Sequence, residues 1–329
     1  MGKKKKEENT NKTFKTQTER KAMLKKVIGE TNKKLKGKVI HFGSSVESWT
    51  KTPFGVKAID DMLGGGIAYG HFSVLWGAPA TGKTTLAYNL IAQAQKKDKI
   101  VYLIPLEAFD PDRAKQCGVQ LEDLVIGEFS KAEECLDTII DLARKKLVDV
   151  IVLDSVHSLS PTGEQEKKSG IKKSLTDDTM AILARKLSEF FRRAVPPIAK
   201  ANIAVLLIGQ TRTNLGGFIA LQTLSGGKAL LHNSVLTLYI RRGQKSDAPK
   251  AKSKVMEMDE NDKETFKTKN IIVGFDSVIK IDKTQTPNTQ HELTSIHLPF
   301  YYKTGFTKPK EKKERPKADE GKTIIEGGK

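Results

Sequence analysis

The chain has 329 residues, 38% of them hydrophobic, and a formal net charge of +18. This length accommodates one large α/β domain with extensions, or two modest domains. No run approaches the roughly 18 apolar residues of a membrane span, and the opening MGKKKKEEN lacks the apolar segment of a signal peptide. We therefore expect a cytoplasmic protein without a membrane partner. Cys117 and Cys135 form neither a metal-binding nor a disulfide pattern.

The positive charge is concentrated at the two ends of the chain. Residues 1–38 contain fourteen Lys or Arg and four acids, and residues 307–329 are also basic. Such an excess predicts a polyanionic partner and salt-sensitive binding. Residues 1–15 and 307–329 are expected to be disordered basic arms that either keep the protein soluble or contact nucleic acid, and the two roles are compatible.

The first expected element is a helix from Thr16 to Leu35. Its apolar residues at helical spacing are Met23, Leu24, Val27 and Ile28, and residues 38–42 then predict a strand. The helix has no partner within its own segment, residues 16–43. An apolar stripe of this kind often docks on a neighbouring domain or subunit.

Apolar strands alternate with helical segments through the middle of the chain. A short helix around Ile59 ends at three glycines, Gly64–Gly66, before the first buried strand at 72–76. Further buried strands are predicted at 100–104, 148–153 and 203–208, with helices after the first strand and at 132–146 and 179–193. Pro196 and Pro197 should end or kink the last helix. This alternation predicts an α/β core with a mostly parallel twisted sheet flanked by helices.

The last part of the core differs from this pattern. Residues 211–227 predict a long flexible stretch, and residues 235–241, 271–281 and 293–301 predict late antiparallel strands. Residues 244–270 are charged and predict an irregular insertion. The predicted core thus covers residues 44–306.

The sequence between the first buried strand and the following helix is GAPATGKT. It fits G-x-x-x-x-G-K-[ST], the phosphate-binding loop, without a mismatch. Backbone N–H groups of such a loop converge on phosphate oxygens, while Lys83 reaches the β- and γ-phosphates and Thr84 binds Mg²⁺. The alternative is a glycine turn that matches by chance. The flanking strand and helix favour the phosphate loop, and hence a nucleoside triphosphate ligand.

Three polar residues follow later strands and are candidates to complete such a site. Asp154 ends the strand VIVLD, where phosphate-loop proteins place an acid that holds the Mg²⁺ water shell. Glu107 follows the second strand and is positioned to activate a water, while Gln210 follows the fourth strand and is positioned to contact a γ-phosphate. Each has an ordinary alternative, as a strand-end acid, a surface glutamate or a loop amide.

The order of several segments resembles the RecA recombinases, the bacterial and phage branch of the RecA/RadA strand-exchange ATPases. The resemblance covers about residues 16–306 and runs through KGKVIHFG, TPFGVKAIDDMLGGGIAYG, GAPATGKTT, LEAFDPDRAKQCGV, VDVIVLDSVHSLSP, IGQTR and SGGKALLHNSVLTLYIRRG. Many ATPases share the phosphate loop, but the EAFDP, GQTR and GGKAL…IRR segments in this order are far more specific.

The resemblance implies roles for individual residues. Glu107 would activate the hydrolytic water, Gln210 would sense the γ-phosphate, and Thr84 and Asp154 would hold Mg²⁺. The ATP-binding loop would comprise Gly77, Ala78, Pro79, Ala80, Thr81, Gly82, Lys83, Thr84 and Thr85. Two segments, 162–179 and 211–227, would face single-stranded DNA; their candidate contacts are Lys167, Lys168, Lys172, Lys173, Arg212, Gly216, Gly217, Gly226 and Gly227.

The sequence also departs from the family pattern. There is one residue fewer between Glu107 and the following Asp-Pro, and Arg113 stands near the place of a tyrosine that stacks on adenine. Ile281 and Lys283 occupy the places of two lysines that reach the neighbouring subunit's ATP, so only Lys283 would keep that role. The usual C-terminal domain is expected to be missing and replaced by the basic tail.

The resemblance implies an Mg²⁺-dependent, DNA-dependent ATPase. It would form filaments on single-stranded DNA, with residues 16–43 packing on the next subunit, and it would pair this DNA with homologous duplex and promote strand exchange. The alternative is a RecA-like accessory or regulatory ATPase that exchanges no strands. A ring helicase with the same core is disfavoured because the sequence shows no separate N-terminal interaction domain.

Overall fold

The computed structural model describes residues 16–37, 39–45, 48–161, 179–214, 221–224, 228–258, 264–289 and 295–307. The chain divides into two units, Met1–Ser48 and Trp49–Lys329. Each unit is described by itself.

The first unit contains helix α1, Gln17–Lys34, followed by a 3₁₀ turn at Gly43–Ser45. A capping box starts the helix: the Thr16 hydroxyl accepts from the Glu19 N–H (3.2 Å), and the Glu19 carboxylate accepts from the Thr16 N–H (3.3 Å). The predicted helix is therefore confirmed. No residue of α1 is buried.

The strand predicted at 38–42 is wrong for residues 39–42, which adopt no strand. The Asn32 side chain binds this segment instead. Its Oδ1 accepts from the N–H groups of Val39 and Ile40, both at 2.8 Å, and its Nδ2 donates to the Ile40 carbonyl at 2.7 Å. A helix side chain thus satisfies backbone groups that a neighbouring strand would otherwise bind.

The second unit is built on one large sheet with the strand order β13-β12-β9-β3-β7-β6-β4-β5. β3 is central and pairs in parallel with β7 and β9, and the pairs β7–β6, β6–β4 and β4–β5 are parallel as well. β12 and β13 complete the other edge in antiparallel fashion. The strands are β3 Phe72–Gly77, β4 Val101–Pro105, β5 Leu124–Ile126, β6 Val150–Asp154, β7 Ala204–Asn214, β9 Ser234–Arg242, β12 Gly274–Thr284 and β13 Ser295–Tyr301. The predicted mostly parallel sheet with late antiparallel strands is confirmed.

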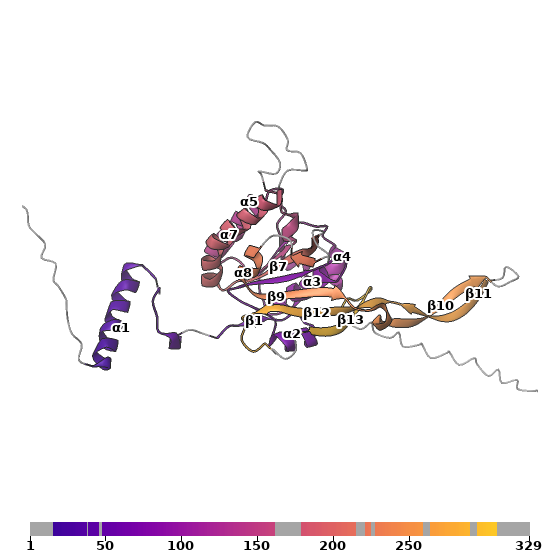
Figure 1. Cartoon of the computed structure of the whole chain (residues 1–329), viewed down its shortest axis with the longest axis horizontal. Coiled ribbons are helices and arrows are strands. Elements are labelled where there is room, and N and C mark those ends of the chain that lie inside the picture. The colour runs from indigo at the N-terminus through magenta and orange to yellow at the C-terminus, as the bar shows by residue number, and fades with distance from the viewer. Residues whose placement is uncertain are drawn as a thin grey trace, which may run out of the picture. The chain divides into compact units, whose positions relative to one another are not determined.

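Helices cover both faces of this sheet (Figure 1). Alternate residues of each strand contribute to opposite faces: Val150 and Val152 join one buried cluster, and Ile151 and Leu153 join the other. The first cluster also contains residues of α2 Lys57–Leu63, α3 Lys83–Gln95 and α4 Pro111–Gln116. The second contains residues of α5 Ala132–Lys145, α7 Thr179–Ala201 and α8 Lys228–Asn233. Two-sided burial explains why these strands are apolar runs rather than alternating ones.

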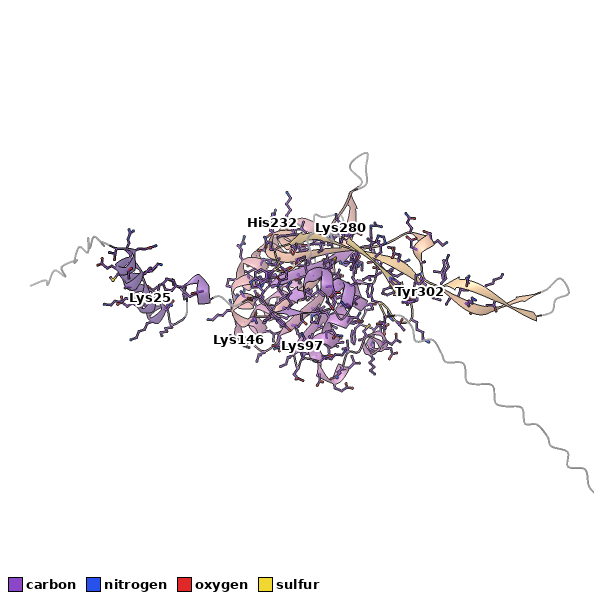
Figure 2. The ribbon with its side chains drawn as sticks, turned by 90° about the horizontal axis from the view of Figure 1, so that it is seen from below. Lys25, Lys97, Lys146, His232, Lys280 and Tyr302 are labelled. Carbon is purple, nitrogen blue, oxygen red and sulfur yellow. The ribbon has the colours of Figure 1, made fainter. Side chains whose placement is uncertain are left out.

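Charged side chains gather at the ends of the covering helices. Lys97 follows α3, Lys146 caps α5, and both are exposed (Figure 2). Helix α7 continues to Ala201, so of the two expectations for Pro196 and Pro197, an end or a kink, the end is wrong. Ala194 and Ile198 are fully buried on either side of the prolines, and this packing holds the last turns in place.

The smaller elements complete the second unit. β1 Lys51–Thr52 pairs with β2 Ile67–Ala68, and β8 Leu221–Leu224 pairs antiparallel with the end of β7. Short 3₁₀ turns lie at Leu121–Asp123, Val156–Ser158 and Lys245–Asp247. The expected flexibility of 211–227 is therefore wrong for 211–214 and 221–224, which are strands.

The predicted irregular insertion is instead a β-ribbon over most of its length. β10 Lys250–Met258 and β11 Glu264–Ile272 pair antiparallel in nine consecutive positions, from Lys250 with Ile272 to Met258 with Glu264. Figure 1 shows this ribbon extending away from the sheet. Both of its faces meet solvent where side chains are described, as at Lys252 and Lys269. An apolar alternation is therefore not needed to form it, and none marks it in the sequence.

Candidate nucleotide-binding site

The phosphate loop joins β3 to α3, and both of its flanking glycines are required by its surroundings. A Cβ on Gly77 would overlap the carbonyl oxygen of Ile240 on the adjacent strand β9. Gly82 caps α3 with φ +95°, and a Cβ there would lie 2.8 Å from the ring of Phe300. Only glycine fits this backbone without strain. The loop therefore presents its N–H groups at the N-terminus of α3, where the helix dipole favours an anion.

Lys83 lies inside the loop and is only 7% exposed. Its ammonium donates to the carbonyls of Gly77 at 3.0 Å and Ala78 at 2.7 Å. Burial lowers the pKa of Lys83, while the nearby charges of Asp154 and Glu107 raise it. The ammonium is thus held at the point where the loop would enclose a phosphate group.

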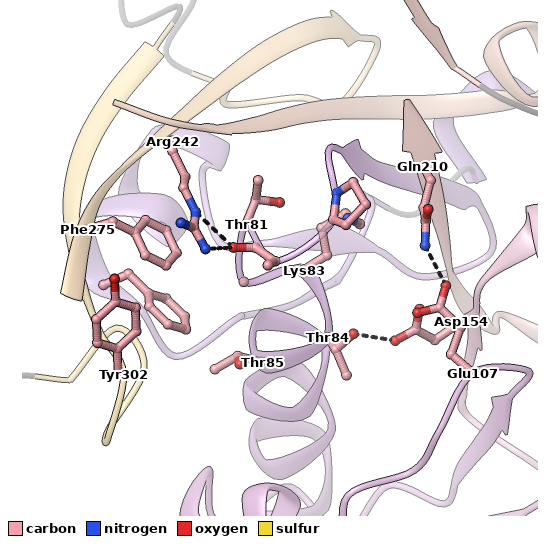
Figure 3. Close-up of a pocket in the computed structure, with 14 residues that line it drawn as sticks. Thr81, Lys83, Thr84, Thr85, Glu107, Asp154, Gln210, Arg242, Phe275 and Tyr302 are labelled. Atoms are coloured by element: carbon pink, nitrogen blue, oxygen red, sulfur yellow. Dashed lines mark hydrogen bonds between the residues drawn. The ribbon is translucent and has the colours of Figure 1, made fainter. Parts of the chain in front are cut away.

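Thr84 and Asp154, the two candidate Mg²⁺ ligands, meet across the pocket. The Thr84 hydroxyl donates to Asp154 Oδ2 at 2.6 Å, and Asp154 ends β6 with 6% exposure (Figure 3). Burial raises the pKa of the Asp154 carboxyl to about 6; Glu107 also raises it, and the Thr84 hydrogen bond and Lys83 lower it. Within the described ranges, no three His, Cys, Asp or Glu side chains form a metal cluster. A hydroxyl and one carboxylate are oxygen donors that suit Mg²⁺, which retains several water ligands.

Glu107 and Gln210 also come together, although 103 positions separate them in the sequence. The Gln210 amide donates to Glu107 Oε1 at 2.7 Å (Figure 3), and the Ser155 hydroxyl donates to the same oxygen at 2.6 Å. Glu107 follows β4, Ser155 follows β6 and Gln210 lies on β7. Because these strands are parallel, their carboxyl ends place the three side chains at one edge of the sheet.

Residues 79–85 of the phosphate loop, together with Glu107, Asp154 and Gln210, line one pocket with a volume of about 320 Å³. Its described lining residues are Pro79, Ala80, Thr81, Gly82, Lys83, Thr84, Thr85, Glu107, Asp154, Gln210, Arg242, Phe275, Phe300 and Tyr302. The pocket thus has an anion-binding loop at one side and the carboxylates and Gln210 at the other.

Four lining residues are missed by sequence reasoning. Arg242, in β9, donates to the Ala80 carbonyl from Nε (3.1 Å) and Nη2 (2.8 Å), and its guanidinium lies 4.4 Å from the ring centre of Phe275. Phe275, Phe300 and Tyr302 form an aromatic wall beside the phosphate loop. The IRR segment contains Arg242, but the long separation from the loop hides this contact.

Arg113 and Lys283 lie outside the described lining of the pocket. Arg113 donates to Thr85 Oγ1 at 3.4 Å and to the Lys303 carbonyl at 2.8 Å, and its guanidinium lies 5.8 Å from the Phe300 ring. It therefore borders the aromatic wall. Lys283 instead donates to the carbonyls of Leu231 and Ser234, both at 2.6 Å, near the end of α8, and burial lowers its pKa.

The predicted DNA contacts are placed only in part. Lys167, Lys168, Lys172, Lys173, Gly216, Gly217, Gly226 and Gly227 lie outside the described residues. The backbone of Arg212 lies in β7, in register with Thr223 of β8 and two positions after Gln210.

The fold and the pocket define a phosphate-loop nucleotide-binding protein with a mostly parallel sheet. The sequence profile of the RecA N-terminal domain matches residues 22–280. The chain belongs to the RecA family.

Curated relatives agree with this assignment. The chain is 35% identical over 212 residues to Protein RecA of Roseiflexus castenholzii, which covers 63% of this chain and 58% of that protein. It is 34% identical over 212 residues to Protein RecA of Chlorobium chlorochromatii, with the same coverage, and 36% identical over 211 residues to Protein RecA of Thermus thermophilus, covering 63% and 60%. The chain thus spans less than two thirds of these relatives. In the part of the chain that the structure describes, no helix is long and apolar enough to cross a lipid bilayer.

Proposed function

We propose that this chain is an ATP-dependent DNA recombinase. It forms filaments on single-stranded DNA, pairs that DNA with homologous duplex and promotes strand exchange. The observation that carries the proposal is the Gln210–Glu107 hydrogen bond of 2.7 Å. Gln210 shares strand β7 with Arg212, and the end of β7 pairs with β8 in the second segment expected to face DNA. One strand therefore connects the nucleotide pocket to a candidate DNA contact, and membership in the RecA family supports this reading.

In the proposed reaction, the phosphate loop and Lys83 bind the triphosphate of ATP. The Thr84 hydroxyl and the Asp154 carboxylate would hold Mg²⁺, which would neutralise charge on the phosphates. Glu107 accepts a proton from the attacking water. Gln210 reports the state of the γ-phosphate to β7 by exchanging its hydrogen bond with Glu107 for one with the nucleotide.

The aromatic wall of Phe275, Phe300 and Tyr302 gives the nucleotide an apolar surface next to the loop. Arg113 borders this wall at Phe300 and has a planar guanidinium that stacks on flat rings. We assign the base to this side of the pocket. Lys283 remains a candidate for reaching the ATP of an adjacent subunit.

The catalytic role of Glu107 is tested by Glu107→Gln. The amide keeps the size of the side chain but accepts a proton poorly, so ATP hydrolysis should fall by about 10² or more while ATP binding persists. The exposed Glu122→Gln is the matched control and should retain the wild-type rate. Fast turnover in Glu107→Gln would remove Glu107 from this role.

Strand exchange between a single-stranded circle and a homologous linear duplex tests the function itself. The wild-type protein with ATP should produce joint molecules, and Lys83→Ala should not. If the wild-type protein hydrolyses ATP yet forms no joint molecules, the accessory-ATPase alternative is favoured.

A further inference from the structure

His157 lies beside the pocket, in the 3₁₀ turn Val156–Ser158 that follows β6. Its Nδ1 lies 2.6 Å from the hydroxyl oxygen of Ser155, and its Nε2 lies 3.6 Å from Glu107 Oε1. We propose that His157 is a positioning residue that orients the Glu107 carboxylate through the Ser155 hydroxyl. This inference rests on the proposed role of Glu107 as the acceptor of the proton from water.

The hydrogen bonds around Ser155 determine which atom donates. A carboxylate only accepts hydrogen bonds, so at 2.6 Å the Ser155 hydroxyl donates its single proton to Glu107 Oε1. The Ser155 oxygen then has only acceptor capacity left for its 2.6 Å contact with His157. His157 must therefore carry a proton on Nδ1 and donate it to Ser155.

The other ring nitrogen agrees with this arrangement. His157 Nε2 lies 3.4 Å from the Ser158 hydroxyl, which is able to donate to it. The neutral Nδ1–H tautomer thus satisfies both ring nitrogens. The donation from Nδ1 to Ser155 is the same whether or not Nε2 carries a proton.

The two oxygens of the Glu107 carboxylate differ in the hydrogen bonds that they accept. Among the described residues, the Ser155 and Gln210 hydrogen bonds to this carboxylate both end on Oε1. Oε2 is left to receive the proton from water. Ser155 is completely buried, so its hydroxyl has little freedom to turn once His157 fixes its oxygen.

The two donors to Glu107 differ in what they respond to. In the proposed cycle Gln210 leaves Glu107 when the γ-phosphate arrives, and Ser155 then remains as the donor that holds the carboxylate. The chain His157–Ser155–Glu107 thus keeps the base oriented in the ATP-bound state. None of the described hydrogen bonds of these three residues involves Lys83 or Thr84. Disrupting the chain should therefore lower the rate of turnover rather than the affinity for ATP.

A pair of substitutions separates the hydrogen bond from the bulk of the ring. His157→Asn retains an N–H donor close to the position of Nδ1, whereas His157→Leu fills the space without a donor. We expect His157→Leu to lower kcat for ATP hydrolysis about tenfold, less than the 10²–10⁴-fold typical of losing a general base, with KM for ATP unchanged. His157→Asn should recover kcat to within about threefold of wild type. Equal kcat in all three proteins, equal losses in both variants or a change confined to KM would overturn the inference.

A spectroscopic measurement tests the arrangement without hydrolysis. Long-range ¹⁵N–¹H NMR correlations of the nucleotide-free wild-type protein distinguish the two imidazole tautomers, and the His157 signals are those absent from His157→Asn among the six histidines. A proton on Nδ1 is expected, and a Ser155→Ala variant should shift the Nδ1 resonance. An Nε2–H tautomer with a bare Nδ1 would overturn the inference, even if the protein hydrolyses ATP. A wild-type protein that hydrolyses no ATP would instead refute the proposed function, whatever the tautomer.

Discussion

The nucleotide pocket and helix α1 differ in which side chains they bury and which they expose. In the pocket, charged and polar groups such as Lys83 and Asp154 are nearly buried, and each has hydrogen-bond partners from its own unit. In α1, apolar side chains are open to solvent: Met23 is 43% exposed, Leu24 49% and Val27 42%. The pocket is therefore a site that one chain can build. Nothing among the described residues buries the stripe on α1, and we expect a second copy of the chain to cover it, as in the proposed filament.

The largest effect is expected in the pocket, from Lys83→Ala. This change removes the buried ammonium that would bind the phosphates, and a charged hydrogen bond of this kind is worth about 1.5–3 kcal/mol. ATP affinity should fall about 10–100-fold and hydrolysis should disappear. Titration with a fluorescent ATP analogue measures the affinity, and a phosphate-release assay measures the hydrolysis. The exposed Lys97→Ala, just beyond the other end of the same helix, is the control (Figure 2). Unchanged affinity in Lys83→Ala would contradict the site.

The second effect is expected in α1, from the double substitution Met23→Glu with Leu24→Glu. Two charges in the apolar stripe should prevent its burial against another subunit, so filaments should be lost in sedimentation and electron microscopy. Binding of ATP by single subunits should persist weakly. Lys25→Gln with Lys26→Gln changes the net charge by the same amount at exposed polar positions and should leave filaments intact. Intact filaments in the glutamate variant would show that α1 is not the subunit contact.

A smaller effect is expected from Gly82→Ala in the pocket. The residue has φ +95°, and the added methyl group would approach the Phe300 ring. We expect the free energy of unfolding to fall by about 1–3 kcal/mol. Urea denaturation measures this change. If the urea concentration at the midpoint of unfolding does not fall, the loop backbone is free to relax around the added methyl group.

The smallest effect is expected from Gly29→Ala in α1. No atom lies within 4 Å of the position that a Cβ would take, and the residue is in the interior of the helix. Alanine should stabilise the helix by about 0.5–1 kcal/mol. Circular dichroism of a peptide spanning residues 16–37 should show more helix. A loss of helix would indicate that this segment needs the conformational freedom of glycine at position 29.

Contiguous features of the pocket and the sheet could be predicted from the sequence. The phosphate loop is a short motif, and strands such as β6 are recognisable because burial on both faces makes Val150–Leu153 a continuous apolar run. Glu107, Asp154 and Gln210 are predictable because each lies at or just after the end of an apolar run. Their meeting in one pocket follows from the parallel order of the strands.

Other features depend on contacts between distant residues and could not be predicted. Arg242 binds the Ala80 carbonyl 162 positions away, and the aromatic wall comes from β12, from β13 and from Tyr302 just after β13, at one edge of the sheet. The ribbon of β10 and β11 lacks an apolar alternation, because neither face packs on the core where side chains are described. His157 follows the predicted strand end by three positions, but only the structure shows that it faces Ser155 and Glu107.

The coupling between the pocket and DNA is the central claim, and steady-state ATP hydrolysis tests it most directly. The rate should be measured with and without single-stranded DNA at moderate salt, with Lys83→Ala as the blank. Strong stimulation by single strands is the predicted result, because DNA bound beyond Gln210 on β7 should release that side chain from Glu107 towards the nucleotide. Hydrolysis at the same rate with and without DNA would contradict the coupling and favour an accessory ATPase.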